Sequence, residues 1–464
     1  MNRTHLPWAL RVRRLPTVLF STALLTACIV ATGSTGHPHH VSPAVTRPAA
    51  TVVRAASATV LPTPPAPVAP PSTVGTIVVP ASFRVPGDPA TTTDGAPLGY
   101  SCPPTHATTL AQADWTEWLT TVARWLGEPG PGSAPIPGLR IEFPPGCYYL
   151  DATLSLDQSH PFVDVVLDGT YTGQGADSPQ FIQTNVPDCD TGTPMLALQH
   201  TGSARVEIEG FTLQGSATEP PPYCGAGGAG LHVGGLSLGT GPHDVTVQGN
   251  IIRDNWGDNL YITPVEGLDV ANNLFYMAGR DSLSVIGGSD ETFTGNFLIN
   301  AGGYAFNIET IPNLDSVQRV LVAFNDAELA TKGLLWNATA FWGTTVQDVM
   351  FQSNVTSSPL IMWTGAVLGG IEHRIAFIGN VGRGRPSAQF QIYGGDNVTV
   401  KNNKLIKGPP QASGYTANPP VFFFADGVCG AQSGNTYWSG TAAVPFRMGM
   451  LHQNGYTWPF PACP

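Results

Sequence analysis

The sequence predicts an all-β protein whose short strands stack as a parallel β-helix, a solenoid, behind an N-terminal capping helix. A short motif ending in Asn recurs at intervals of 23 to 29 residues, and a second alternating apolar segment follows each copy. The chain also has 53 Gly and 43 Pro residues, which leave little room for long helices. A hydrophobic content of 42% with 11% charged residues indicates a large core and excludes a disordered chain.

The motif reads apolar–x–apolar–x–x–Asn. Its seven Asn residues are Asn250, Asn273, Asn296, Asn325, Asn354, Asn380 and Asn403. Two earlier copies carry Phe211 and Thr170 at the Asn position. Such units cannot bury an apolar face alone and must stack, whereas propeller blades need about 40 residues and hairpins. We expect an Asn ladder at one turn, where Asn tolerates a left-handed backbone and its amides bond rung to rung.

A second strand is predicted at a steady offset after each Asn, as in 259–263, 282–286 and 305–309. Period-two alternation places one set of side chains toward the core: Leu260, Ile262, Leu283, Val285, Phe306 and Ile308. The opposite side carries one column formed by Tyr261, Ser284, Asn307, Trp336 and Gln391. The next outward column is formed by Thr263, Ile286, Glu309 and Tyr393.

The region before the repeats predicts a cap. Apolar residues at helical spacing over Thr109–Leu126 predict a helix that ends before Gly127. A strand from Leu139 then closes on Phe143-Pro144-Pro145-Gly146-Cys147-Tyr148, and Val166-Leu167-Asp168-Gly169 follows. This series resembles the opening of the pectate-lyase/polygalacturonase superfamily, over roughly Leu98 to Lys407. The resemblance implies a single-stranded, right-handed parallel β-helix in a bacterial, exported protein.

The resemblance is specific for the fold and not for a reaction, because the superfamily contains lyases, hydrolases, epimerases and phage tailspikes. Its reaction motifs are absent from this sequence. Polygalacturonases carry Asn-Thr-Asp, Asp-Asp, His-Gly and Arg-x-Lys elements, and alginate epimerases carry Asp-Pro-His-Glu. The resemblance therefore implies an action on carbohydrate, or binding of it, and leaves the reaction open.

The N-terminus predicts export to the cell surface or the extracellular space. Three basic residues, Arg11, Arg13 and Arg14, precede an apolar run over 15–31, and we assign 1–32 to a secretory signal. Leu25-Thr26-Ala27-Cys28 resembles a lipobox, in which Cys28 would be lipidated and tether the protein to a membrane. Cleavage near Gly33 or Gly36 and a retained 17-residue anchor are the alternatives. A Pro/Ala/Thr-rich linker over 33–95, a β-helix domain over 96–430 and a C-terminal cap or tail over 431–464 follow.

The cysteines agree with export. Besides Cys28 there are six, Cys102, Cys147, Cys189, Cys224, Cys429 and Cys463, and an even number outside the cytosol indicates disulfides. Proximity in sequence favours the pairs 102–147, 189–224 and 429–463 among 15 connectivities. No CxxC pair supports a zinc or redox site.

Two carboxylates are candidates for acid/base chemistry. Asp258 and Asp281 each lie eight residues beyond a motif Asn, so stacking would place them about 4.8 Å apart on successive rungs. Like charges at that distance raise one pKa and separate an acid from a base or nucleophile. The alternative is that both cap turns by accepting backbone N–H bonds.

Other candidates surround this pair. Glu309 would be a third catalytic carboxylate, and the predicted substrate-binding residues are Arg253, Trp256, Tyr261, Arg280, Asn307 and Trp336. Aromatic rings stack on sugar faces and amides bond hydroxyls. Three histidines, His232, His243 and His373, are further acid/base candidates or ordinary loop residues. Residues 250–310 hold eight acidic residues and two basic ones, so a polyuronate would be repelled unless Ca²⁺ bridged it.

These observations favour an enzyme that cleaves a polysaccharide as a hydrolase or lyase. The alternative is a non-catalytic, surface-exposed glycan-binding or structural protein. A formal net charge of −11 excludes a nucleic-acid binder that works through a basic surface. An exposed carboxylate pair flanked by aromatics would favour the enzyme, and two Asp residues bonded into turns would favour the binder.

Overall fold

In the computed structural model, residues 56–464 form the larger of two units. The structure describes residues 61–63, 65, 75–80, 83, 102, 117–118, 138–150, 153–156, 164–170, 178–184, 194–198, 205–217, 228–235, 241–310, 316–328, 336–341, 344–356, 362–367, 370–384, 390–392, 395–407, 422–424, 429–438, 443–445, 448–450 and 463.

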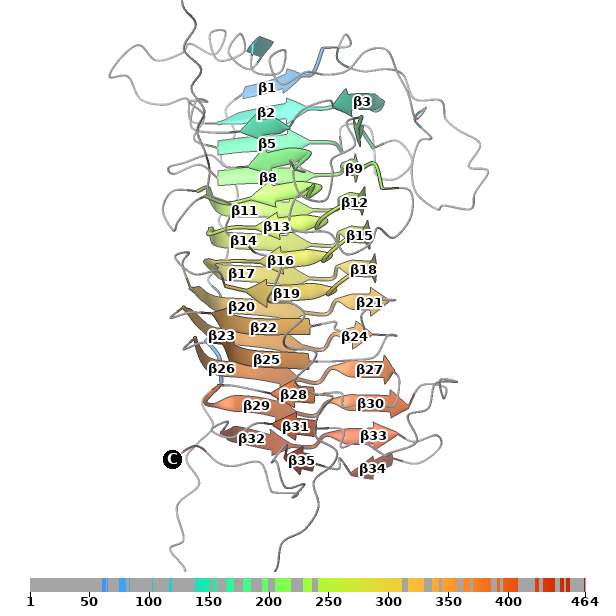
Figure 1. Ribbon diagram of the computed structural model, residues 1–464. Coiled ribbons are helices and arrows are strands. Elements are labelled where there is room, and N and C mark those ends of the chain that lie inside the picture. Colours follow the sequence, from blue (N-terminus) through green and yellow to red (C-terminus); the bar gives the residue numbers. More distant parts are fainter. Residues whose placement is uncertain are drawn as a thin grey trace, which may run out of the picture. The chain divides into compact units, whose positions relative to one another are not determined.

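Three long sheets run along the axis of the larger unit, and each coil of the chain gives one strand to each sheet (Figure 1). The first sheet contains β1 (Gly75–Val78), β2 (Leu139–Glu142), β5 (Asp164–Asp168), β8 (Arg205–Glu209), β11 (His243–Gln248), β14 (Glu266–Ala271), β17 (Gly288–Thr294), β20 (Val317–Ala323), β23 (Thr345–Gln352), β26 (Ile371–Ile378), β29 (Val398–Lys401) and β32 (Gly430–Ser433).

The second sheet contains β3 (Cys147–Leu150), β6 (Gln180–Gln183), β9 (Thr212–Gln214), β12 (Ile251–Asn255), β15 (Leu274–Ala278), β18 (Phe297–Ala301), β21 (Asp326–Glu328), β24 (Val355–Thr356), β27 (Val381–Gly384), β30 (Lys404–Lys407), β33 (Thr436–Trp438) and β34 (Ala443–Pro445). The third contains β4 (Leu154–Leu156), β7 (Leu196–Leu198), β10 (Leu231–Val233), β13 (Leu260–Ile262), β16 (Leu283–Val285), β19 (Phe306–Glu309), β22 (Trp336–Phe341), β25 (Met362–Val367), β28 (Phe390–Ile392), β31 (Phe422–Phe424) and β35 (Met448–Met450).

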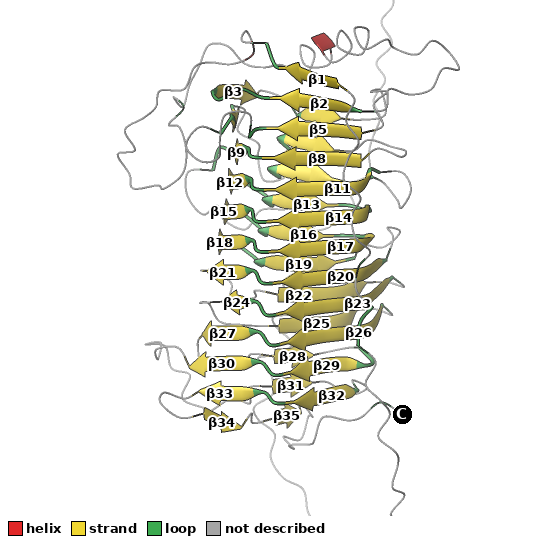
Figure 2. Ribbon diagram, turned by 180° about the vertical axis from the view of Figure 1, so that it is seen from behind, coloured by secondary structure: helices red, strands yellow, loops and turns green. Residues whose placement is uncertain are grey.

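Neighbouring strands in these sheets pair in parallel, except that β34 pairs antiparallel with β33 at one end. Strands of successive coils lie directly over one another, as the view from the other side also shows (Figure 2). The predicted parallel β-helix is therefore confirmed. One apolar core fills its interior, and in the third sheet it takes Leu260, Leu283 and Phe306 from three consecutive coils, as the alternation predicts.

The Asn ladder is confirmed and is longer than predicted. Asn296 is typical: its backbone N and its Nδ2 donate to Asn325 Oδ1 of the next coil at 2.9 and 3.0 Å, and Nδ2 also donates to Val270 O at 2.8 Å. The same bonds continue from Asn403 to Asn435, which forms an eighth rung beyond the seven predicted ones. Buried amides are thus satisfied without water.

We expected the ladder Asn to have the left-handed backbone conformation of this turn. The residue before it has that conformation instead. The φ angles of Gly249, Asn272, Gly295 and Phe324 are positive, at 63°, 56°, 64° and 58°. Each of these positions precedes a ladder Asn in sequence. The ladder Asn itself keeps an ordinary backbone, and its side chain is free to bond along the axis.

The β-helix extends beyond both predicted boundaries. At its start, β1 lies within the predicted linker and pairs with β2, with Gly75 opposite Leu139. At its end, β32 to β35 continue the three sheets into the predicted tail. Of the predicted capping helix, Glu117 and Trp118 are described and helical; the rest of 109–126 lies outside the described residues.

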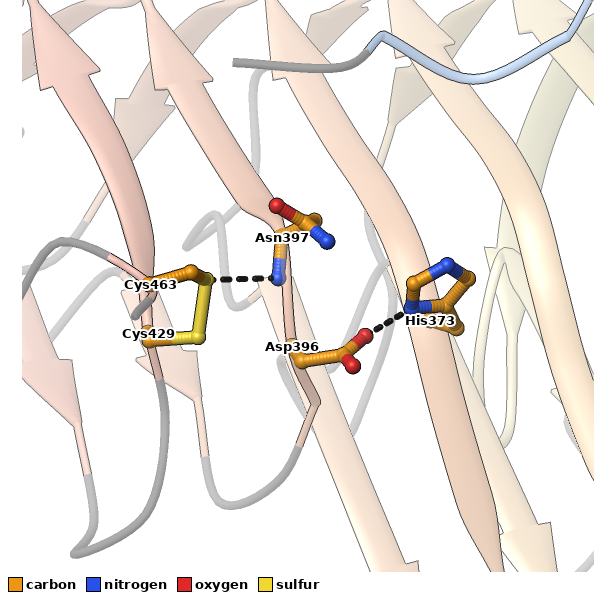
Figure 3. Close-up of a disulfide and its surroundings, with 5 residues drawn as sticks. All are labelled: His373, Asp396, Asn397, Cys429 and Cys463. Atoms are coloured by element: carbon orange, nitrogen blue, oxygen red, sulfur yellow. Dashed lines mark hydrogen bonds and ion pairs between the residues drawn. A yellow bond between two sulfur atoms is a disulfide. The ribbon is translucent and has the colours of Figure 1, made fainter. Parts of the chain in front are cut away.

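Two of the predicted disulfides are present, Cys102–Cys147 and Cys429–Cys463. In the second, Asn397 N donates to Cys463 Sγ at 3.1 Å, next to the pair of His373 with Asp396 (Figure 3). Cys28, Cys189, Cys224 and the signal segment lie outside the described residues. Among the residues that are described, no helix is long and apolar enough to cross a membrane.

Candidate functional site

The turn that leads into the third sheet carries the two predicted carboxylates. Asp258 precedes β13, and Asp281 precedes β16 in the next coil. Asp281 N donates to Asp258 Oδ1 at 2.9 Å. Tyr304 N of the following coil donates to Asp281 Oδ1 at 2.7 Å. The two side chains therefore lie on successive rungs, as their spacing predicts, and each accepts a backbone N–H from the coil after its own.

Arg280 closes the space around Asp258. Its Nε and Nη2 donate to the two Asp258 oxygens at 2.8 and 2.7 Å, a two-point arrangement that holds a carboxylate firmly. Its Nε also lies 3.4 Å from Asp281 Oδ2. The side chains of Asp258, Asp281 and Arg280 are 0%, 2% and 11% exposed. Acid/base chemistry needs contact with a substrate, and this burial opposes it, whereas the turn-capping alternative agrees with the two backbone bonds.

Burial and charge set the electrostatics of this cluster. Burial raises the pKa of Asp281 to about 7, with Arg280 acting to lower it and Asp258 to raise it. Burial alone would lower the pKa of Arg280, but the charges of Asp258 and Asp281 raise it well above its usual range. Arg280 therefore stays charged and compensates the buried carboxylates.

An outward column of side chains lies over this turn on the third sheet. His232, Tyr261, Ser284 and Asn307 follow one another in register on β10, β13, β16 and β19. The rings of His232 and Tyr261 meet edge-to-face with centroids 5.3 Å apart. Arg280 Cζ lies 5.8 Å from the centre of the Tyr261 ring. The guanidinium of Arg280 and the rings of Tyr261 and His232 thus form one continuous group across three coils.

Hydrogen bonds connect the buried Asp281 to the surface. Ser284 Oγ donates to Asp281 Oδ2 at 3.0 Å, and Asn307 Nδ2 donates to the same oxygen at 2.9 Å. Asn307 Nδ2 also donates to Glu309 Oε2 at 3.1 Å. Ser284 and Asn307 are buried, while Glu309 is partly exposed. Glu309 is consequently the predicted carboxylate that remains open to solvent.

The prediction that Trp336 follows Asn307 in this column is wrong. Phe306 pairs with Trp336, and Asn307 pairs with Asn337. Trp336 lies 11 residues after its ladder Asn, whereas Phe306 lies 10 residues after its own. Because side chains alternate along a strand, one extra residue moves Trp336 out of the outward column and Asn337 into it. Gln391 keeps its predicted place through Trp363.

Two other predicted binding residues lie away from this column. Arg253 is on β12 of the second sheet, where its Nε pairs with Asp254 at 2.6 Å and its guanidinium lies over Tyr276 at 5.7 Å. Trp256 Nε1 donates to Ser216 Oγ at 3.0 Å in the corner between the second and third sheets. The structure brings together Tyr261, Arg280, Asn307 and Glu309 and leaves these two apart.

His232 belongs to the site although its place in it was not predicted. Its Nε2 is hydrogen-bonded to Thr263 Oγ1 at 3.0 Å, and burial lowers its pKa to about 4. Leu231-His232-Val233 has the alternation of the other strands of the third sheet. His232 lies farther in sequence from its motif position, Phe211, than Tyr261 lies from Asn250. The sequence spacing therefore did not predict that His232 and Tyr261 are neighbours. The other two candidate histidines lie on the first sheet, where His243 pairs with Asp244 and His373 with Asp396.

No group of three or more His, Cys, Asp or Glu side chains within the described ranges is arranged to hold a metal ion. A Ca²⁺ ion that bridges the protein to an anionic glycan stays a prediction.

Comparison with family models finds no match, and no curated protein matches the chain. Solved structures do. A capsular polysaccharide depolymerase, tailspike gp49 of Acinetobacter baumannii bacteriophage Fri1, matches with TM-score 0.41 and 13% identity over 74% of this chain and 63% of its own. The surface adhesin PfbA of Streptococcus pneumoniae matches with TM-score 0.44 and 12% identity over 75% of this chain and 93% of the adhesin chain. The A-module of the mannuronan C-5 epimerase AlgE4 of Azotobacter vinelandii matches with TM-score 0.44 and 11% identity over 70% of this chain and 83% of the A-module chain. At these values the similarity carries no functional inference.

Proposed function

We propose that the protein binds a polysaccharide on the outward face of the third sheet, around Tyr261 and Glu309. The observation that carries the proposal is that Asp258 and Asp281 accept backbone N–H bonds beneath Arg280. Carboxylates held in this way stiffen the surface above them and are poorly placed for proton transfer to a ligand. The geometry therefore favours recognition over cleavage.

The chemistry of the surface supports a sugar ligand. The partly exposed groups are the rings of His232 and Tyr261 and the carboxylate of Glu309, a combination that can stack on pyranose faces and accept hydroxyl hydrogen bonds. Both rings are uncharged at neutral pH, because burial lowers the pKa of His232 to about 4 and raises that of Tyr261 to about 12.

The charge balance supports a neutral glycan. Arg280 gives its Nε and Nη2 to Asp258 and Ser284, so its charge is already compensated within the protein. Among the described residues of the site, the charge left at the surface is that of Glu309. A polyuronate would meet this negative charge without a cation to pair with. Export to the cell surface or beyond, which the N-terminal signal pattern and the disulfides support, would bring the protein to such a ligand.

Replacing Tyr261 by Ala is expected to weaken glycan binding at least about tenfold, since truncating an aromatic hot spot at an interface typically costs about 2 kcal/mol or more and about 1.4 kcal/mol is tenfold in affinity. The measurement is the dissociation constant for the best ligand from a panel of neutral and acidic polysaccharides. Tyr276→Ala is the matched control: Tyr276 also lies under an arginine, Arg253, but on the second sheet. Equal losses in both variants would overturn the assignment of the site.

Cleavage is the second candidate, and one observation favours it. Asn307 Nδ2 bridges Glu309 and Asp281, so a partly exposed carboxylate is joined to a buried one whose pKa is raised to about 7. In such an enzyme, Glu309 would exchange a proton with the sugar, and the buried Asp281 would position Glu309 through Asn307 without itself exchanging a proton with the substrate.

Under this second candidate, Glu309→Gln is expected to lower turnover by about 10²- to 10⁴-fold with little change in stability. New reducing ends together with the absorbance of unsaturated sugars would identify a lyase, and reducing ends alone a hydrolase. Glu328→Gln, on β21 of the second sheet, is the control for a lost surface charge. A protein that binds a polysaccharide of the panel and yields neither signal is a binder.

A further inference from the structure

The Pro-rich segment before β1 contacts the side of the β-helix far along its axis. Thr63 N donates to Asp348 Oδ1 at 3.0 Å, although the two residues are 285 positions apart in sequence. Pro62 beside it is buried. Figure 1 shows this blue segment next to β23 and β26, well away from β1. A segment with the composition of a solvated linker is therefore bound to the fold at this point.

Asp348 is built to accept this contact. It has φ 56° in the bulge of β23, and its side chain is 5% exposed. Arg374 Nε and Nη2 donate to its two oxygens, which leaves a lone pair of Oδ1 for Thr63 N. Burial would raise the pKa of Asp348, but Arg374 and Thr63 hold that pKa below its usual value. Arg374 thus holds the acceptor in place, and the bond from Thr63 N adds to its stabilisation as a carboxylate.

The other end of the segment is also fixed. Gly75–Val78 forms β1, which pairs with β2, and Val79 N donates to Glu142 O at 2.9 Å. In the first sheet, β23 is eight strands beyond β1, which corresponds to about 38 Å along the axis at about 4.8 Å per strand. The twelve residues from Thr63 to Gly75 can reach about 40 Å. The two attachment points are therefore separated by nearly the full reach of the chain between them.

The sequence of the segment suits this role. Pro64, Pro65 and Pro67 follow Thr63, and proline removes N–H donors that a strand beside the sheet would otherwise leave unpaired. Thr63 supplies one of the donors that remain, and this donor makes the bond to Asp348.

We propose that the Pro-rich segment is an intramolecular strap, attached to the side of the β-helix at Asp348 and to its first coil through β1. Leu61, the first described residue, then lies beside β23 and not at the N-terminal end of the β-helix.

The test is hydrogen exchange at the Thr63 amide in the full-length protein. In the wild type this amide is expected to exchange at least about tenfold more slowly than in an unfolded chain. Asp348→Ala removes the acceptor and should bring exchange to the unfolded-chain rate. Asp290→Ala is the matched control, because Asp290 also has a positive φ, 59°, in a bulge of the first sheet and pairs with Arg319 in the same way; it should leave Thr63 protected.

Asp348→Asn provides a second variant, since an amide oxygen can still accept from Thr63 N; we expect it to keep most of the protection. Exchange of Thr63 at the unfolded-chain rate in the wild type would overturn the proposal without any variant. Equal loss of protection in Asp290→Ala and Asp348→Ala would also overturn it, because the effect would then come from general loosening of the first sheet.

Discussion

Replacing Asn325 by Ala is expected to lower the free energy of unfolding by about 3 to 5 kcal/mol, since each buried polar group left without a partner costs about 1 to 3 kcal/mol. Asn325 Oδ1 accepts from both the backbone N and the Nδ2 of Asn296. Its Nδ2 donates to Phe293 O and to Asn354 Oδ1, both at 3.0 Å. The residue is buried between two rungs, so water cannot replace these bonds.

Asn435→Ala is the matched control, in the same column at the last described rung. Asn435 is part-exposed, and its Nδ2 donates to Val400 O at 2.8 Å. Water can satisfy the groups it leaves, so we expect a loss of about 1 kcal/mol. The measurement is the midpoint and slope of chemical unfolding for each variant, because a stack of coils need not unfold in one step. Equal losses at the two rungs, or a loss below about 1 kcal/mol for Asn325→Ala, would contradict a cooperative ladder.

The ladder also shows why the fold could be predicted from the sequence. Each coil must present its Asn where the Asn before and after it can bond, so the motif occurs seven times in the sequence. Asn435 was not predicted because Gly430 and Gln432 stand at the two apolar positions of the motif and because its interval from Asn403, 32 residues, is longer than the others. The left-handed position was misassigned because it is occupied by Gly, Asn, Ser and even Phe, a set that shares a backbone conformation and no composition.

The sequence predicted which coil each carboxylate of the candidate site occupies, but not how deeply its side chain is buried. Equal spacing from the ladder correctly put Asp258 and Asp281 on successive rungs. Whether a side chain at a corner faces solvent depends on its neighbours across the turn, here Arg280, and no periodicity carries that information. The error at Trp336 has a different cause: a single extra residue in one connection changes which side of the strand a residue occupies.

A buried carboxyl is expected to make the fold most stable in acid. Glu291 on β17 occupies a core-facing position between Leu268 and Val320. It is 0% exposed, and neither of its carboxyl oxygens has a hydrogen-bond partner among the described residues. Burial, and to a smaller extent the charge of Asp290, raises its pKa well above the usual 4.5. Glu291 therefore stays protonated to a higher pH in the folded protein than in the unfolded chain.

The sign of the pH effect follows from this difference between states. A carboxyl whose pKa is raised by folding contributes fully below its unfolded pKa, and its contribution is lost as pH rises toward the folded pKa. The unfolded chain ionises above about pH 4.5, while the folded chain does not, so the free energy of unfolding falls by about 1.4 kcal/mol per pH unit. The loss from this one group accumulates with each pH unit until the folded carboxyl ionises as well.

Glu291→Met should remove this loss, because Met fills a similar volume without a titratable group. We expect the stability of the variant relative to the wild type to rise with pH above about 4.5, by up to about 1.4 kcal/mol per pH unit. The free energy of unfolding of both proteins, measured from pH 4.5 to 8, gives this difference directly.

The difference between variant and wild type is needed because other groups titrate in the same direction: burial also raises the pKa of Glu207, Asp254, Asp269 and Asp281. Glu266→Gln is the control, since Glu266 is exposed on the neighbouring strand β14 and its loss should leave the pH profile nearly unchanged. If Glu291→Met instead ran parallel to the wild type at all pH values, Glu291 would have to be ionised in the core. It would then need a cation or water beside it.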